Sequence, residues 1–292
     1  MSVDGQILLD KPAGVTSFSA LNDLKSSLGT RRIGHAGTLD KFATGLLVVL
    51  IGRYTKLAEL FSGLDKCYRA TLVLGRRTDT LDPEGEVIEE GPIPELTQID
   101  EAADRLRGTI DQIPPVYSAV HVEGRRAYRI ARSGGVPKLE ARRVTIHRLE
   151  IGDYRPPELD IVVECSKGTY VRAVARDLGT LAGSCAYLKT LRRTGVGPYH
   201  VEEAIAADPS AAAQLLVQLA GSLERLLRLG GIGTATVTDE AVGGVRNGQK
   251  PQGWFFTDAP KTDGLFTLLD SGGNLLALAV RDRGEYRYKM VL

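Results

Sequence analysis

One segment organises this chain, Arg31-Arg32-Ile33-Gly34-His35-Ala36-Gly37-Thr38-Leu39-Asp40, which holds two basic residues, two glycines, a histidine and a carboxylate. Upstream, residues 17–28 have the apolar spacing of a helix, with Ser17 expected as its N-cap and Gly29 as its stop. Downstream, residues 46–51 are continuously apolar, which is typical of a strand buried on both faces. We therefore expect a loop at 31–40, in which a rigid scaffold orients Asp40.

The residue types of this loop have several interpretations. A loop aspartate is commonly a turn former or helix cap, and a histidine beside glycine is commonly just solvated. The order of the residues is more informative. The segment from Gly34 to Asp40, followed by Ala43-Thr44-Gly45, resembles the catalytic motif of the TruB family, bacterial tRNA pseudouridine synthases that act on uridine 55 of the T loop.

Six further segments resemble motifs of the same family in the same order, so that the likeness spans roughly residues 7–200. They are residues 9–17 (LDKPAGVTS), 65–70 (DKCYRA), 75–80 (GRRTDT), 114–119 (PPVYSA), 165–172 (CSKGTYVR) and 191–193 (LRR). One departure is visible, because Lys41 stands where the family usually has proline. We expect the loss of this proline to loosen the loop backbone without removing chemistry.

Length and composition restrict the class of protein. A chain of 292 residues is long enough for about two domains, and it has no run of ~18 apolar residues that would span a membrane. Residues 1–6 lack the basic and apolar regions of a signal peptide. Three scattered cysteines and four histidines without metal-ligand spacing favour neither disulfides nor a metal site. We expect a cytoplasmic protein without a metal.

Charge is unevenly distributed although the net charge is only +1. Residues 79–111 hold eleven acids and two bases, whereas residues 117–148 hold eight bases and two acids. Residues 165–195 add six bases against one acid. A basic face can bind a phosphate backbone while an acidic face points away, although two solvated helices of opposite sign would give the same pattern.

Hydrophobic periodicity predicts alternating strands and helices over the first two thirds of the chain. Within residues 66–75, Tyr68, Ala70, Leu72 and Leu74 share one face of a strand. The other strands are predicted at 6–9, 145–151 and 159–164, and the helices at 53–61, 97–106 and 170–181, the second of them opening on a Thr97-Gln98-Ile99-Asp100 capping box.

The resemblance implies an α+β fold: a pseudouridine-synthase-like catalytic domain over residues 1–229, with a mixed, mostly antiparallel central sheet flanked by helices. A helical region at 204–229, interrupted at Asp208-Pro209, is expected to end this domain. Residues 230–292 would form a small β-rich domain, with a hairpin around residues 271–274. By position this domain resembles the PUA-like RNA-binding domain that follows many such catalytic domains.

Aromatic and basic residues interleave near the middle of the chain, where we expect a strand at 117–122 and a short basic helix at 126–133. Rings and guanidinium groups can stack on unpaired bases. In the family this region, about 114–143, resembles the thumb that closes over the T arm of tRNA. The residues concerned are Tyr117, Tyr128, Arg125, Arg126, Arg129 and Arg132.

Pseudouridine formation breaks the bond from N1 to C1′ of a uridine and rejoins the base through C5. It needs no cofactor, because the freed base is both leaving group and returning nucleophile. The resemblance implies that Asp40 is the catalytic carboxylate, which either attacks C1′ or takes a proton from C2′. Arg172, otherwise a surface arginine of the helix at 170–181, would pair with it through two parallel donors.

The resemblance assigns the remaining site residues as well. Tyr68 would stack on the target base together with Leu191, with Tyr170 in the same substrate-binding set. His35 would take the place of the extruded nucleotide in the T loop, because the base must leave its stack to react. Lys11 would support the site from the N-terminal turn.

Two other classes of protein remain open from the residues. An RNA-binding or RNA-folding protein could use the same surface without turnover, but it would not need Asp40 and Arg172. A two-carboxylate glycosidase would need a second acid opposite the first. By sequence, Asp10 is the nearest candidate for that acid.

Overall fold

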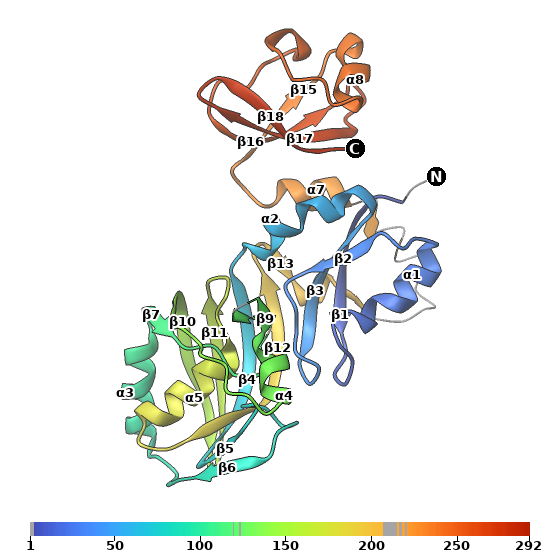
Figure 1. The fold of residues 1–292 in the computed structure, drawn as a ribbon. Coiled ribbons are helices and arrows are strands. Elements are labelled where there is room, and N and C mark those ends of the chain that lie inside the picture. Colours follow the sequence, from blue (N-terminus) through green and yellow to red (C-terminus); the bar gives the residue numbers. More distant parts are fainter. Residues whose placement is uncertain (1–2, 119, 123, 207–214, 216–217, 220) are drawn as a thin grey trace.

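The computed structural model describes residues 3–118, 120–122, 124–206, 215, 218–219 and 221–292. These residues form one large sheet with helices against it and a second, smaller sheet near the C-terminus (Figure 1). The strands of the large sheet are β1 (Gly5–Lys11), β2 (Ile33–Ala36), β3 (Thr44–Ile51), β4 (Lys66–Leu74), β7 (Gly108–Gln112), β10 (Arg142–Arg155), β11 (Glu158–Cys165), β12 (Ala186–Val196), β13 (Tyr199–His200) and β14 (Ile205–Ala206).

The large sheet has the strand order β14-β1-β3-β12-β4-β11-β10-β7, with β2 added beside β3 and β13 beside β12. The pairs β1–β14 and β3–β12 are parallel. The other strand pairs of this sheet are antiparallel. The expectation of a mixed, mostly antiparallel central sheet is confirmed. The helices around it are η1 (Ser19–Leu21), α1 (Asn22–Leu28), η2 (Gly52–Leu57), α2 (Ala58–Ser62), α3 (Leu96–Leu106), α5 (Val171–Leu181), η3 (Val201–Glu203) and α7 (Ser222–Leu227).

Strand β3 is buried on both faces, as its apolar run predicts. All six side chains from Leu46 to Ile51 are fully buried. Leu47, Val49 and Ile51 pack with Leu21 and Leu24 on one face of the sheet. The alternate side chains belong to a different apolar cluster on the other face. This double burial fixes the strand that directly follows the Asp40 loop.

Strand β4 has one buried face, which helices α3 and α5 cover. Tyr68, Ala70, Leu72 and Leu74 all belong to a single apolar cluster that includes residues of both helices. The predicted alternation is confirmed. This packing brings Tyr68 close to the first turn of α5, which carries Arg172.

Several local predictions are wrong in their details, in part because tertiary contacts replace the expected local ones. The helix expected from Ser17 is a short 3₁₀ turn followed by α1, and Ser17 caps neither of them. Part of the expected loop, Ile33–Ala36, pairs with β3 as strand β2. The helix expected at 53–61 divides into η2 and α2. The capping box of α3 is formed by Glu95 and Gln98, not by Thr97 and Asp100.

The small sheet has the order β15-β16-β17-β18 and contains the predicted hairpin. Its elements are β15 (Ile232–Thr236), α8 (Asp239–Arg246), η4 (Gly253–Phe255), β16 (Gly264–Leu269), β17 (Leu275–Asp282) and β18 (Glu285–Val291). Leu278 and Met290 of this sheet share a buried cluster with Leu57 and Phe61. The two sheets are therefore joined through apolar side chains. Asp208-Pro209, the expected interruption, lies outside the described residues.

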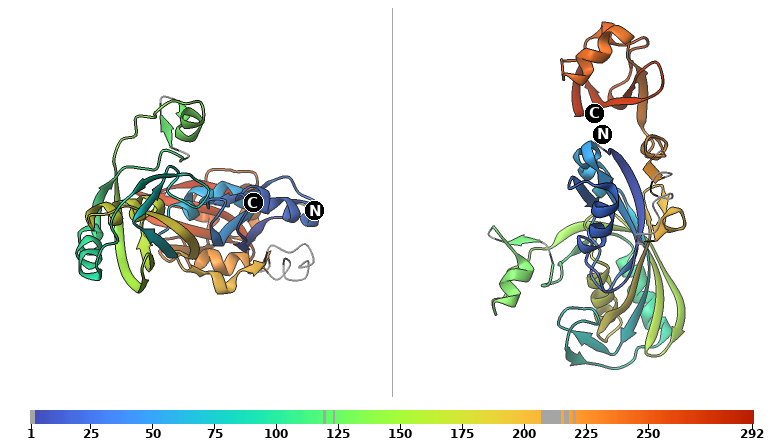
Figure 2. Two further views of the ribbon diagram at one scale, coloured as in Figure 1. Left: turned by 90° about the horizontal axis from the view of Figure 1, so that it is seen from below. Right: turned by 90° about the vertical axis from the view of Figure 1, so that its right-hand side faces the viewer.

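The predicted thumb projects from the large sheet (Figure 2). It consists of β8 (His121–Val122), β9 (Arg125–Arg126) and α4 (Ala127–Arg132). The expected strand at 117–122 is therefore limited to two paired residues, and residue 119 lies outside the described residues.

The first part of the acidic segment 79–111 lies in a hairpin formed by β5 (Arg76–Thr78) and β6 (Val87–Glu90). In the described part of the chain, no helix has the length and apolarity needed to cross a membrane.

Candidate active site

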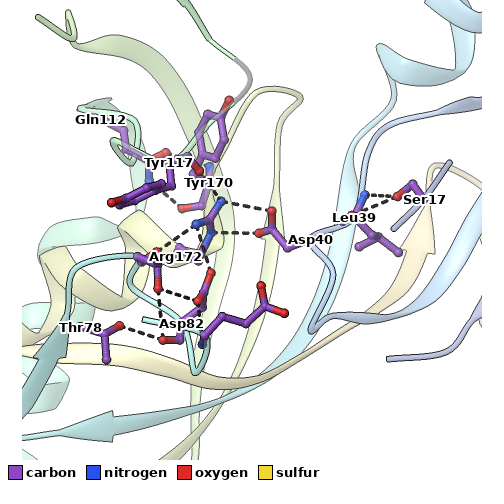
Figure 3. Close-up of polar contacts among 11 residues, drawn as sticks. Ser17, Leu39, Asp40, Thr78, Asp82, Gln112, Tyr117, Tyr170 and Arg172 are labelled. Atoms are coloured by element: carbon purple, nitrogen blue, oxygen red, sulfur yellow. Dashed lines mark hydrogen bonds and ion pairs between the residues drawn. The ribbon is translucent and has the colours of Figure 1, made fainter. Parts of the chain in front are cut away.

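Ser17, which lies in the N-terminal segment, fixes the Asp40 loop through hydrogen bonds to the Leu39 backbone. Its hydroxyl donates to the carbonyl oxygen of Leu39 at 3.0 Å and accepts from the Leu39 amide at 2.8 Å (Figure 3). Gly14 donates its amide to the carbonyl oxygen of Lys41 at 2.8 Å. The N-terminal turn therefore fixes the backbone on both sides of Asp40, which explains why Ser17 is 2% exposed and serves no helix.

Gly45 allows the loop to approach strand β12. Its φ is +103°, and a side-chain carbon at this position would lie 2.2 Å from the Arg193 carbonyl oxygen. Only glycine fits such a close backbone approach. The parallel pairing of residues 44 and 45 with 192 and 193 thus brings Asp40 to the side of the sheet that carries Leu191 and Arg193.

Arg172 joins two carboxylates. Its Nη2 donates to Asp40 Oδ1 at 3.1 Å, and its Nε lies 2.9 Å from Asp40 Oδ2 in an ion pair that lacks hydrogen-bond alignment. On the other side, Nη1 donates to Asp82 Oδ2 at 3.2 Å. Arg172 is only 5% exposed. The interpretation of Arg172 as a surface residue is therefore wrong, because the loops around α5 cover its first turn.

Asp82 is a site residue that the sequence did not reveal. It lies in the turn between β5 and β6, where its carboxylate accepts from the Thr80 hydroxyl at 2.6 Å and from the Glu84 amide at 3.0 Å. Leu81 beside it has a φ of 62°, which is costly for such a side chain and is found where surrounding contacts fix the backbone. In the sequence, Asp82 is distinguished only by its place in the acidic segment 79–111.

The backbone around Arg172 is fixed by further hydrogen bonds. Arg172 donates to the carbonyl oxygens of Thr80 and Tyr117, each at 2.9 Å. Gln112 accepts from the Tyr170 amide at 2.9 Å and donates to the Tyr170 carbonyl at 3.3 Å (Figure 3). One guanidinium group therefore links the Asp40 loop, the Asp82 turn, the base of the thumb and the start of α5.

These elements surround a pocket of about 530 Å³. Of the residues predicted for the site, the pocket lining contains Asp40, Tyr68, Tyr170, Arg172 and Leu191. Tyr68 and Leu191 are 8% and 6% exposed, so they form a largely apolar wall, whereas 38% of the Asp40 side chain is exposed. The pocket lining thus combines a carboxylate with a ring and an aliphatic side chain.

Arg193 is a second site residue that the sequence indicates only as part of the motif at 191–193. It lines the pocket and is 1% exposed. Its guanidinium donates to the carbonyl oxygens of Leu46 at 2.7 Å and Gly37 at 3.0 Å. It therefore positions the loop before Asp40. The alternation of β12, with Leu191 and Arg193 on one face, could have indicated this role.

Lys11 and His35 lie outside the residues that line the pocket. The Lys11 ammonium donates to the carbonyl oxygens of Pro12 at 2.8 Å and Val15 at 2.9 Å, which supports the turn beneath the loop. His35 belongs to β2, and its partly exposed side chain has a buried Nδ1 without a hydrogen-bond partner among the described residues. Burial lowers the pKa of His35, as does the charge of Arg193.

The thumb contributes Tyr117 and Tyr128 to the pocket lining. Arg125 and Arg129 are exposed on its surface, and Arg129 donates to the Tyr128 hydroxyl at 3.3 Å. The side chain of Arg126 lies outside the described part of the structure. The thumb therefore has an exposed cation, Arg129, beside an aromatic ring that lines the pocket.

Asp10 is not a second catalytic acid. It forms an ion pair with Arg192 at 2.7 Å and lies outside the pocket lining, so the glycosidase interpretation that relied on it is wrong. The carboxylate that does lie near Asp40 is Asp82, and Arg172 holds both of them. Asp82 is therefore not available as the free second acid that glycosidases need.

Burial dominates the protonation equilibria of this site. It raises the pKa of Asp40, an effect that the Asp82 and Glu84 carboxylates increase and the Arg172 charge opposes. Burial also lowers the pKa of Lys66, a pocket residue, to about 8, with a further contribution from the charge of Arg193. Desolvation disfavours charged forms of either sign, which explains both directions.

Comparison with known proteins identifies the family. The family model described as TruB family pseudouridylate synthase, N-terminal domain, matches residues 25–171. A relative named tRNA pseudouridine synthase B from Mycobacterium bovis (strain BCG / Pasteur 1173P2) is 40% identical over 287 residues, covering 96% of this chain and 93% of the relative. The chain belongs to the TruB family. A protein of the same name from Mycobacterium sp. (strain KMS) is 47% identical over 210 residues, covering 70% of this chain and 71% of its own.

Membership of the TruB family makes this protein a pseudouridine synthase, and the alternative of an RNA-binding protein without turnover is not favoured. Solved structures agree in fold. A chain from a Cbf5-Nop10-Gar1 complex superimposes with a TM-score of 0.69 at 24% identity, covering 94% of this chain and 78% of that one. One from an archaeal box H/ACA Nop10-Cbf5 complex gives a TM-score of 0.66 at 21% identity, covering 98% and 85%. At these identities the likeness concerns the fold alone.

Proposed function

We propose that this TruB-family protein converts uridine 55 in the T loop of tRNA to pseudouridine, with Asp40 as the catalytic carboxylate. The observation that carries the assignment is the geometry of Asp40, which Arg172 holds at 2.9 and 3.1 Å at the edge of a pocket walled by Tyr68 and Leu191. A flipped uridine would stack on these two side chains. Its C1′ would then face the carboxylate.

The reaction is an isomerisation in which atoms balance without a cofactor. The N1–C1′ bond breaks, the base turns, and a C5–C1′ bond forms while the proton at C5 is lost and N1 gains one. Asp40 assists either by attacking C1′ or by accepting a proton from C2′. Tyr170 and Arg193 would keep the detached base between the pocket walls. Release of tritium from C5 of uridine-labelled tRNA, with carbodiimide mapping of the modified position, tests the assignment directly.

The surrounding elements have separate roles in this proposal. Residues 1–229 act as the catalytic domain, and the thumb, about 114–143, closes over the T arm. His35 occupies the space that the extruded nucleotide leaves, and Lys11 supports the loop from below. Residues 230–292 act as a PUA-like domain that adds contacts to the RNA. The exposed arginines of the thumb and the separate four-stranded sheet near the C-terminus support this division.

Replacing Arg125 and Arg129 together with alanine is expected to weaken tRNA binding, because their charges address phosphates and not C1′. Each lost phosphate contact should reduce the slope of log K against log salt concentration by about 0.7 to 0.9. Binding measured over a salt series gives this slope. The paired change at Arg76 and Arg105, which are also exposed, removes the same charge outside the thumb and should leave the slope unchanged. A slope that stays constant in the thumb variant would place RNA elsewhere.

The pH dependence of turnover should follow the raised pKa of Asp40. Asp40 works as an anion, so activity is full above this pKa and is lost as the pH falls through it, at a higher pH than for an ordinary aspartate. Glu84→Gln removes a charge that raises this pKa, and the acid limb of kcat should therefore move to lower pH. The profile of Glu158→Gln, a change outside the pocket, should match that of the unmodified protein. An acid limb that moves upward in Glu84→Gln would contradict the assignment.

A further inference from the structure

Lys41 directly follows Asp40 and occupies the position at which the proline of the family motif would stand. Its side chain lines the pocket, and its Nζ lies 3.4 Å from Oε1 of Glu84, which lines the same pocket from the turn after Asp82. The two side chains are 54% and 48% exposed. They therefore form an ion pair in contact with solvent at the rim of the site.

We propose that Lys41 binds a backbone phosphate of the RNA beside the flipped nucleotide, and that Glu84 holds the lysine in the absence of RNA. This inference rests on the proposed function, because it places a nucleotide in the pocket. It assigns a binding role to the one residue that departs from the catalytic motif.

The backbone and the side chain of Lys41 are constrained differently. The Lys41 carbonyl accepts from the Gly14 amide at 2.8 Å and lies 3.5 Å from the Lys11 ammonium. Among the described residues, the polar partner of the side chain is Glu84, in an exposed ion pair. Exposed ion pairs are weak, so the ammonium can exchange its partner at low cost.

Position 41 also fits the course of the RNA. If C1′ of the target nucleotide faces Asp40, the ribose lies at the mouth of the pocket, and the phosphates on its two sides leave the pocket there. The cationic residues that line the pocket in the described part of the chain are Lys41, Lys66, Arg172 and Arg193, and of these Lys41 is the exposed one. A lysine ammonium suits this task, because it binds phosphate as a point charge without a fixed direction.

The charge balance of this rim explains why Glu84 needs a partner. Asp40 and Asp82 are held by Arg172, whereas Glu84 is exposed and paired with Lys41. Without the lysine, Glu84 would repel an approaching phosphate. In the free protein the pair neutralises the rim, and in the complex the lysine would neutralise the phosphate instead.

A competing explanation is a structural one, in which the Lys41–Glu84 pair ties the loop to the Asp82 turn and so replaces the stiffness of proline. The two explanations differ for Glu84→Gln. A structural tie is broken equally by changing either partner. A phosphate ligand is weakened by changing Lys41 and is released by changing Glu84, so that the two substitutions have effects of opposite sign.

The experiment measures KM and kcat on a tRNA transcript, and direct binding over a salt series, for Lys41→Gln, Glu84→Gln and the double variant. Lys41→Gln should raise KM about fivefold and reduce the salt slope by about 0.7 to 0.9, with the effect on KM and not on kcat. Glu84→Gln should lower KM, and this gain should disappear in the Lys41→Gln background. Lys41→Arg keeps the positive charge, so its KM should equal that of the unmodified protein.

Lys189 and Glu158 provide the matched control, because they form an exposed ion pair outside the pocket lining. Changing each to Gln alters the net charge by the same amount and should leave KM within about twofold, since exposed pairs contribute little. The inference is overturned if Lys41→Gln and Glu84→Gln impair the protein alike, or if the control pair reproduces their effects. An unmodified protein that makes no pseudouridine would instead overturn the proposed function, and the binding data would still test Lys41.

Discussion

Asp40→Asn is expected to abolish pseudouridine formation while tRNA affinity stays within about tenfold, equivalent to ~1.4 kcal/mol. Asparagine keeps the size of the side chain and can still accept from Arg172, but it is neither an anionic nucleophile nor a base. Loss of a nucleophile costs a factor of ~10⁴ to ~10⁶ in turnover. Binding should change far less, because phosphate contacts supply most of the affinity.

Tritium release from C5 measures the turnover, and filter binding measures the affinity. Asp153→Asn makes the same chemical change at an exposed position of β10 and should behave as the unmodified protein does. Lys41→Pro should keep its turnover at saturating tRNA, since proline keeps the carbonyl oxygen that Gly14 binds, while its KM should rise as in Lys41→Gln. Turnover near the unmodified rate in Asp40→Asn would remove the catalytic assignment and the function built on it.

Arg172→Met is expected to lower both activity and stability. The substitution leaves Asp82, which is 5% exposed, as a buried carboxylate without its cation. Removing one partner of such a pair typically costs 3–5 kcal/mol, so urea unfolding should show a loss of about this size. Turnover should fall by ~10² or more, because the orientation of Asp40 and the base of the thumb depend on the same guanidinium group.

The double variant Arg172→Met with Asp82→Asn separates the two effects. Removing the buried charge should restore much of the lost stability, because the unpaired carboxylate is its main cause. It should not restore turnover, because Asp40 remains without a positioning partner. Recovery of activity in the double variant would show that Arg172 acts only as a counter-ion for Asp82.

Sequence patterns predict a helix or strand best where burial alone decides which of its faces are apolar. The continuous apolar run of β3 and the alternation around Tyr68 in β4 both depend on burial alone, and both are confirmed. The mixed sheet and the hairpin near the C-terminus are confirmed for the same reason. Ordered motifs then indicated Asp40, Tyr68, Arg172 and Leu191, which do line one pocket.

Partners that are distant along the chain account for what the sequence missed. A serine before a helical pattern is usually a cap, yet Ser17 bonds to Leu39, and no local rule chooses between these two acceptors. Asp82 resembles the other acids around it until the fold brings it to Arg172, 90 residues away. Arg172 itself has the spacing of an exposed helix position and is buried only because loops cover it.

The apolar cluster shared by the two sheets has a thermal consequence. Leu278 and Met290 pack against Leu57 and Phe61, so neither sheet can lose its packing without exposing buried side chains of the other. Parts that share a core tend to melt as one cooperative unit. A calorimeter should then record one main heat-absorption peak for this chain. A destabilising substitution in the small sheet should also lower the local stability of η2 and α2, which directly precede the strand that carries Tyr68.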